Sequence, residues 1–280
     1  MNGAIWAIVL LAGLLFGSFG NSVVYRLPRR LLEEWQNEAK ESLGLPLGAP
    51  DAHLSATRSH CPQCKSLIAW YDNFPVLSWL MLRGKCRHCE AAIPGRYLLL
   101  ELAGVAVAGG AYYVWGLSPQ FVTAILLGFP LLWLGAIDLE HMLLPDKLVY
   151  PCLWLGFVAA TQNVFVDPST AIWGAVVGFA FLALPGYFFR IIRGMDGLGG
   201  GDAKLTAALG AFLGPMGILA AVFLGSVIAV LFHVFLRFKK TASRDTPMPF
   251  GPPLIIAGVI MLVSQHWHVL QNILPWAVFN

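Results

Sequence analysis

The chain has 280 residues, of which 58% are hydrophobic and only 12% are charged, with a formal net charge of +3 and a mean hydropathy of +0.69. Ordinary globular domains carry roughly 25% charged residues, so this composition excludes a single soluble domain. It predicts an all-α polytopic membrane protein.

Apolar stretches of the length that crosses a bilayer, about 20 residues, recur along the chain. About eight transmembrane helices are predicted, at residues 2–25, 97–117, 119–137, 148–165, 171–191, 203–213, 216–236 and 252–274. No positive residue precedes the first stretch and no small-residue cleavage site follows it, so we expect a retained anchor rather than a signal peptide. The sixth stretch is short and is also compatible with half of a broken helix.

Lysine and arginine residues are distributed unevenly among the loops. If the amino terminus faces outward, all 18 of them fall in segments on the inner side of the membrane, which is the bias expected of cytoplasmic loops. This distribution favours an even number of spans. It also predicts three regions: a first transmembrane helix at 1–25, a cytoplasmic loop domain at 26–96 and a membrane domain at 97–280.

The cytoplasmic loop domain begins with an amphipathic stretch, Leu31 to Leu43. Such a stretch can form a helix that lies on the membrane surface. A solvated linker helix explains the same pattern equally well, so both interpretations remain open.

The motifs CPQC and CRHC place Cys61, Cys64, Cys86 and Cys89 in the same loop domain. Four thiolates in two CxxC turns favour a structural tetrahedral zinc site, although the separation of 21 residues slightly exceeds the usual range. A redox-active CxxC and unliganded thiols are the alternatives, and disulfides are disfavoured because cytoplasmic thiols stay reduced. The fifth cysteine, Cys152, is predicted to be a small buried hydrophobe.

Two aspartates stand where apolar runs end on the same predicted membrane face: Asp138 in GAIDLEHMLLPD, and Asp202 after a glycine run in GLGGGDAKL. Acidic groups in membrane segments are costly and usually functional. Two carboxylates about 4 Å apart repel by roughly 4 kcal/mol at an effective dielectric of 20, so one would hold a proton, as in aspartic proteases. Helix capping or ion pairing is the alternative. Glu140, Asp146 and Asp196 compete for the role, and Asp146 also suits a helix cap.

Taken together, these motifs resemble the type IV prepilin peptidases, which are bifunctional leader peptidases and N-methyltransferases of bacterial pilus and type II secretion systems. The resemblance runs through GSFGNSVVYRLP, the CPQC and CRHC loop, IDLEHMLLPD, GLGGGDAKLTAALGAFLG and PFGP. It implies that Asp138 and Asp202 are the catalytic aspartates, with Asp202 in the GxGD motif. It also implies an inner-membrane enzyme whose active site faces the cytoplasm.

The same resemblance implies the substrates and the cofactor. The enzyme would remove the basic leader of prepilins or pseudopilins and methylate the new amino terminus with S-adenosylmethionine. Gly84, in LRGKC, is the one candidate for the methyl-donor site. The expected partners are these substrates and the lipid bilayer, with no nucleic acid.

Two other functions fit the acidic residues. A presenilin-type intramembrane aspartyl protease shares the GxGD motif, but its acids would lie deeper within the spans, whereas Asp138 and Asp202 lie at span boundaries near Arg193 and Lys204. A transporter or assembly scaffold would use such acids to relay protons or to pair with cations. Cleavage of a model prepilin would separate the three.

Overall fold

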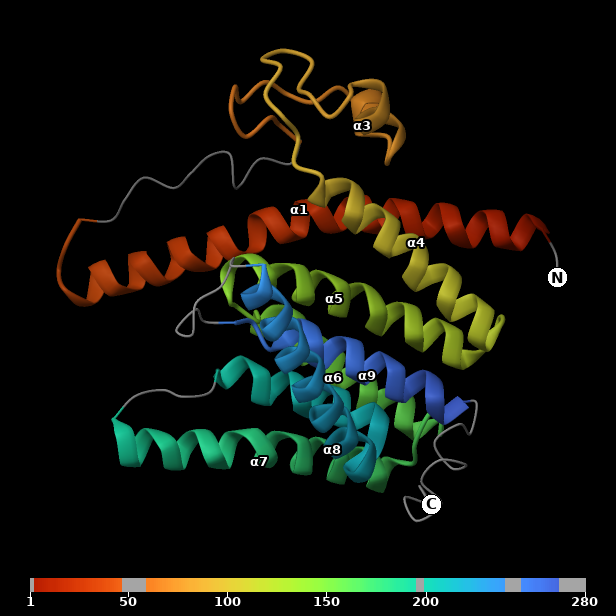
Figure 1. Ribbon diagram of the computed structural model, residues 1–280, viewed down its shortest axis with the longest axis vertical. Helices are drawn as coiled ribbons and strands as arrows, with labels where there is room; N and C mark the ends of the chain where they lie inside the picture. The colour runs from red at the N-terminus through yellow and green to blue at the C-terminus, as the bar shows by residue number, and fades with distance from the viewer. Residues whose placement is uncertain (1–2, 47–58, 195–198, 240–247, 267–280) are drawn as a thin grey trace. The chain divides into compact units, whose positions relative to one another are not determined.

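The computed structural model describes residues 3–46, 59–194, 199–239 and 248–266, and the regular elements within these ranges are all helical (Figure 1). The predicted all-α class is therefore confirmed for the described part of the chain. Contacts divide the chain into two compact units, Met1–Tyr112 and Tyr113–Asn280.

The first unit contains the long helix α1 (Gly3–Ser42), the short helices η1 (Trp70–Asn73) and α3 (Leu77–Met81), and most of α4 (Arg96–Trp115). α1 continues well beyond the predicted end of the first span, because the amphipathic stretch extends the same helix. Pro28 lies inside α1 and is buried. Both interpretations of the amphipathic stretch predicted a helix, and the structure confirms a helix from Leu31 to Ser42.

α1 and α4 approach closely at glycines. A side chain at Gly17 would place its Cβ 2.8 Å from the Cα of Glu101, and Gly104 lies against the backbone of Gly13. Small residues at such contacts let helix backbones approach, as is common in membranes. Asn21 then donates a hydrogen bond from its side chain to the Tyr97 carbonyl at 3.1 Å, so the two helices are also joined by a polar contact.

The described part of the second unit is a bundle of five helices: α5 (Pro119–His141), α6 (Asp146–Thr161), α7 (Pro168–Arg193), α8 (Gly200–Phe238) and α9 (Gly251–His266). α8 is the central element, and its first half is almost entirely buried. Leu205, Ala208 and Ile218 of α8 have no exposed surface, and they belong to a core shared with Leu134 of α5 and Leu254 of α9.

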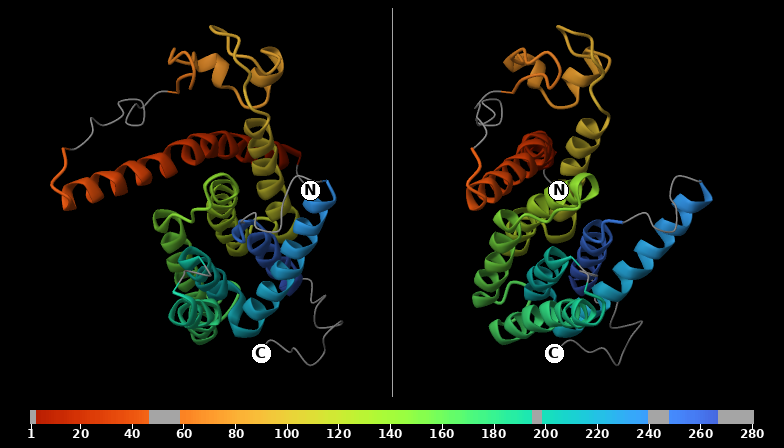
Figure 2. Two further views of the ribbon diagram at one scale, coloured as in Figure 1. Left: turned by 60° about the vertical axis from the view of Figure 1, so that its left-hand side comes forward. Right: turned by 90° about the vertical axis from the view of Figure 1, so that its left-hand side faces the viewer.

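α8 bends in its middle (Figure 2). Gly214 has non-helical dihedral angles, φ 71° and ψ 177°, and Pro215 follows it. Proline lacks the amide hydrogen that would continue the helix, and the side chain of Gln265 donates to the carbonyl of Leu213 at 3.1 Å. The predicted sixth and seventh spans are thus the two halves of one bent helix.

Five of the described helices are long and apolar enough to cross a membrane: α1, α4, α5, α7 and α8. α6 and the described part of α9 have 16 residues each, slightly below the usual range of about 17 to 25. The polytopic prediction is supported at this level, and the count of eight spans stays a prediction.

α7 and α8 pack at very short distance, because glycines face each other across the contact. Gly174 of α7 lies against the carbonyl of Gly210, and a side chain at Gly178 would place its Cβ 2.7 Å from the carbonyl oxygen of Thr206. Any side chain at these positions would push the helices apart. This contact fixes the first half of α8, and with it the helix start that carries Asp202.

Candidate active site and metal centre

Asp138 lies in the last turn of α5, and its side chain is only 5% exposed. α5 ends there because Met142 adopts the left-handed conformation, with φ 51°, and its N–H bonds to the Asp138 carbonyl at 2.9 Å. The carboxyl group therefore projects from a helix terminus, as the sequence predicted.

Asp202 lies in the first turn of α8 and is partly buried. A side chain at Gly199, the residue before α8, would place its Cβ 2.9 Å from Asp202 Oδ2. The glycine run thus leaves room for a carboxyl group that turns back toward the start of its own helix. A helix start carries partial positive charge, which stabilises an acidic group there.

A third helix terminus, the start of α9, completes the surroundings of Asp138. The backbone N–H of Gly251, the first residue of α9, donates a hydrogen bond to Asp138 Oδ2 at 2.9 Å. A Cβ at position 251 would lie 2.6 Å from the same oxygen, so only glycine permits this approach. Sequence reasoning assigned no role to Gly251, although the PFGP motif opens α9 and marks the place.

The helix ends that carry the two carboxyl groups lie close to a common side chain, Leu144. Leu144 connects their surroundings: its side chain lies against Gly201, the neighbour of Asp202, and against Gly251, whose N–H binds Asp138. The end of α5, the start of α8 and the start of α9 therefore converge, as predicted for the first two. Paired carboxyl groups of this kind can share a proton and activate a water molecule.

The competing acids have other contacts. Asp146 accepts hydrogen bonds from the Lys204 ammonium at 2.8 Å on both oxygens, and it makes no side-chain cap on α6, whose cap residue is Pro145. The expected helix cap at Asp146 is therefore wrong, and an ion pair between α6 and α8 takes its place. Glu140 is exposed and lies 3.9 Å from His141. Asp196 lies outside the described residues.

The four predicted cysteine ligands come together in the first unit. Their sulfur atoms all lie within 4.8 Å of one another, and Cys61 Sγ and Cys89 Sγ are 3.8 Å apart. Zinc–sulfur bonds of about 2.3 Å in a tetrahedron place the sulfurs roughly 3.8 Å from each other. The donor set therefore fits a tetrahedral metal ion.

The two CxxC motifs have the same local backbone. In the first motif, the Cys61 N–H donates to the Ser66 carbonyl, and the Cys61 carbonyl accepts the Lys65 N–H. In the second motif, Cys86 makes the same two hydrogen bonds, with the Ala91 carbonyl and the Glu90 N–H. Lys65 and Glu90 both have positive φ, 60° and 56°. The loop therefore contains two equivalent tight turns, each presenting two thiols to the same point.

Polar neighbours stabilise the thiolate form and the loop. The Ser66 side chain lies 2.8 Å from Cys64 Sγ, and this hydrogen bond lowers the pKa of the Cys64 thiol to about 6. Arg87 forms a bidentate pair with Asp72 at 2.5 and 2.7 Å. The hydrogen bond from Arg87 holds the pKa of the Asp72 carboxyl below its usual range.

Comparisons with known proteins identify the family of the chain. Residues 11–115 match the bacterial peptidase A24 N-terminal domain, and residues 125–234 match the type IV leader peptidase family. Curated relatives named prepilin leader peptidase/N-methyltransferase include proteins from Stutzerimonas stutzeri (43% identical; 91% of this chain, 89% of the relative), Pseudomonas aeruginosa (40%; 91% and 88%) and Xanthomonas campestris (39%; 89% and 88%).

The chain belongs to the type IV leader peptidase family. The N-terminal family domain contains all four clustered cysteines, and the peptidase domain contains Asp138 and Asp202. No solved structure matches the chain significantly.

Gly84 was the sequence-based candidate for the methyl-donor site. It has φ +67°, and a Cβ at this position would lie 2.9 Å from the indole ring of Trp79. Trp79 in turn donates its indole N–H to the Ile93 carbonyl at 3.3 Å. Gly84 therefore supports the position of Trp79, and the prediction that it takes part in methyl-donor binding stays untested.

Proposed function

We propose that this chain is a membrane aspartic endopeptidase that removes the basic leader of type IV prepilins or pseudopilins and then methylates the new amino terminus from S-adenosylmethionine. The observation that supports the peptidase half is the convergence of the helix ends that carry Asp138 and Asp202, which both lie close to Leu144. The shared name of its relatives supports both halves.

In the proposed cleavage, the two aspartates take different parts. Repulsion between neighbouring carboxylates favours a state in which one is ionised and the other protonated. The ionised group accepts a proton from water as the water attacks the scissile carbonyl, and the protonated group donates a hydrogen bond to the carbonyl oxygen. The N–H of Gly251 donates to the Asp138 carboxyl group and so fixes its position at the start of α9.

Zinc is proposed as the ion held by Cys61, Cys64, Cys86 and Cys89. Four cysteines leave no open coordination position, which is typical of structural rather than catalytic zinc. The ion would hold the loop in its folded form, and binding would draw on thiolates such as that of Cys64.

The proposed topology has about eight spans and a cytoplasmic active site in a bacterial inner membrane. In this topology the two halves of α8 on either side of Gly214 are separate spans, the first of them short, and the lysine and arginine bias favours an inner position for the Asp138 and Asp202 ends. The proposed regions are the first span at 1–25, the cysteine loop at 26–96 and the peptidase domain at 97–280. A basic leader would remain in the cytoplasm, next to this site.

Incubating the purified protein with a full-length prepilin in detergent tests the proposal. We expect one cut at the junction between the leader and the apolar helix, followed by transfer of a labelled methyl group to the new amino terminus. A cut inside the apolar helix would instead support an intramembrane protease of the presenilin type. Intact substrate would favour the transporter or scaffold alternative.

A further inference from the structure

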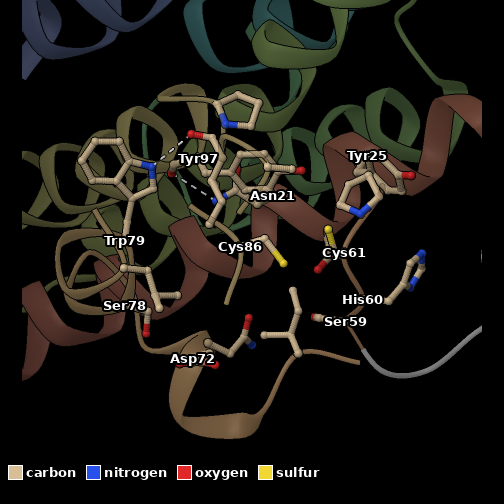
Figure 3. A pocket seen from close by; sticks show the side chains of 18 of the residues that line it. Asn21, Tyr25, Ser59, His60, Cys61, Asp72, Ser78, Trp79, Cys86 and Tyr97 are labelled. Carbon is tan, nitrogen blue, oxygen red and sulfur yellow. Dashed lines mark hydrogen bonds between the residues drawn. The ribbon is translucent and has the colours of Figure 1, made fainter. Parts of the chain in front are cut away.

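A cavity of about 390 Å³ lies within the first unit, where α1 and the first turns of α4 meet the cysteine loop (Figure 3). Its volume lies in the range of about 300 to 1,000 Å³ found for small-molecule sites. All of its lining residues fall between Ser18 and Glu101, so none comes from the helices that carry the aspartate pair. Cys61 and Cys86 form part of its wall, and their sulfur atoms are drawn close together in Figure 3.

We propose that this cavity binds the methyl donor and that the Glu101 carboxylate faces the donor's positive charge. The inference rests on the methyltransferase half of the proposed function and gives it a location. S-adenosylmethionine carries a sulfonium and an ammonium cation, a carboxylate and an adenine ring. The cavity is lined by an acidic residue for the cations, by arginines for the carboxylate and by aromatic rings for the adenine.

Glu101 is the acidic group of the cavity that lacks a cationic partner. Its side chain is buried, with 8% exposed. It accepts the Val76 N–H at 2.7 Å and a hydrogen bond from Ser18, but no ion pair to it occurs among the described residues. Asp72, the other carboxylate of the cavity wall, is engaged by Arg87. A buried carboxylate without a counter-ion is costly, and a cationic ligand removes that cost.

The rest of the cavity suits the remaining parts of the donor. Arg29 lies 3.6 Å from the centre of the Tyr25 ring, Arg96 lies 5.1 Å from that of Tyr97, and all four residues line the cavity. These guanidinium groups suit a carboxylate. The ring of Trp79 is fixed by its hydrogen bond to Ile93, which provides an aromatic surface on which adenine can stack.

The backbone next to Glu101 is strained. Val76 has φ 61° and ψ −51°, a region that β-branched residues rarely adopt. Such strain costs of order 1–3 kcal/mol and is concentrated at ligand sites. The Glu101 carboxylate holds the N–H of this residue, so the loop is fixed to α4 at the carboxylate that we assign to the ligand.

Direct binding to the full-length, detergent-solubilised protein tests the assignment, with two probes measured by titration calorimetry. S-adenosylmethionine carries the positive charges, whereas 5′-methylthioadenosine keeps the nucleoside and has none. Glu101→Gln should weaken binding of the first probe about tenfold or more and leave that of the second within twofold. Glu38→Gln, an exposed change on α1, should leave both unchanged. Ser22→Trp fills the cavity and should abolish binding of both probes.

Three results would overturn the proposal. One is normal S-adenosylmethionine binding by Glu101→Gln. Another is equal loss of both probes in that variant, which would mean that Glu101 only supports Val76. The third is normal binding by Ser22→Trp, which decides the matter even where Glu101→Gln does not fold. A wild-type protein that transfers no methyl group to a pre-cleaved pilin would instead refute the proposed methyltransferase function.

Discussion

The two compact units differ in what holds them together. Between residues 59 and 95, the cysteine loop of the first unit contains two short helices, of four and five residues, and it brings four thiols to one point. The second unit has long helices around a core in which Leu134, Leu205 and Ile218 are fully buried. We expect a loop with so little apolar core to depend on the proposed metal ion for its order, whereas the bundle depends on close helix packing.

The comparison extends to the candidate chemistry. The acids of the second unit project from helix ends that the bundle holds in place, and the cavity of the first unit is enclosed partly by the loop. Damage to the loop should therefore reach methylation directly and peptide cleavage only indirectly.

Replacing either aspartate should abolish cleavage. Asp138→Asn and Asp202→Asn keep the size of the side chain but remove the ionisable group, and proton transfer by such groups contributes about 10²- to 10⁴-fold to rates. We expect a loss of roughly that size or more in each variant, measured by leader removal from a model prepilin, with normal amounts of protein in the membrane. Asp146→Asn, which breaks only the Lys204 pair, should be much milder. Full activity in Asp202→Asn would rule out the pair as the catalytic group.

Removing two ligands should release the metal. Purified protein should contain about one zinc ion per chain, and changing Cys61 and Cys64 together to Ser should remove it, because two thiolates cannot complete a tetrahedral site. Cys152→Ala, which alters the buried cysteine of α6, should retain the ion. Elemental analysis measures the zinc content per chain. Zinc that persists in the double variant would show that the assignment of the cysteine ligands is wrong.

Adding one methyl group at the contact between α7 and α8 should destabilise the second unit. Gly210→Ala places a Cβ against the Gly174 backbone, and overpacking of this kind typically costs about 1–3 kcal/mol. Gly135→Ala is the matched control, because its Cβ would meet only Ile255 at an ordinary 3.5 Å. Thermal unfolding in detergent should show a lower midpoint for Gly210→Ala alone. Equal midpoints would contradict the close helix contact.

The smallest effect is expected at the Asp72–Arg87 pair of the loop. Arg87 lowers the pKa of Asp72 in the folded protein, so the pair stabilises the loop above the unfolded pKa of about 4 and loses its effect as the pH falls through the folded value. Asp72→Asn should lower the unfolding midpoint slightly, and by the same amount from pH 5 to pH 8. A difference that changes across this interval would mean that another group is involved.

Local features of this chain could be predicted from its sequence. The turns that bring Cys61 next to Cys64, and Cys86 next to Cys89, follow from the two CxxC motifs, and the break at Gly214 and Pro215 follows from residues that interrupt a helix. Asp138 and Asp202 were placed at helix ends because apolar runs stop beside them. Each of these inferences depends on residues that are close in the sequence, where spacing and composition contain the information.

Contacts between distant residues could not be predicted in this way. Gly251 lies 113 residues from Asp138, and no periodicity indicates that its N–H meets that carboxyl group. The ion pair between Asp146 and Lys204 joins two helices and replaced the expected helix cap. The cavity around Glu101 needs α1, the loop and α4 together, so it became visible only in three dimensions.

The central claim is that cleavage and methylation use separate sites in separate units. It is tested most directly by supplying a pre-cleaved pilin and labelled S-adenosylmethionine to purified Asp202→Asn protein. The account predicts methyl transfer at a rate close to that of the wild type, because this change leaves the cysteine loop and its cavity intact. Loss of methyl transfer in a well-folded Asp202→Asn protein would contradict the account, since the aspartate site would then serve both reactions.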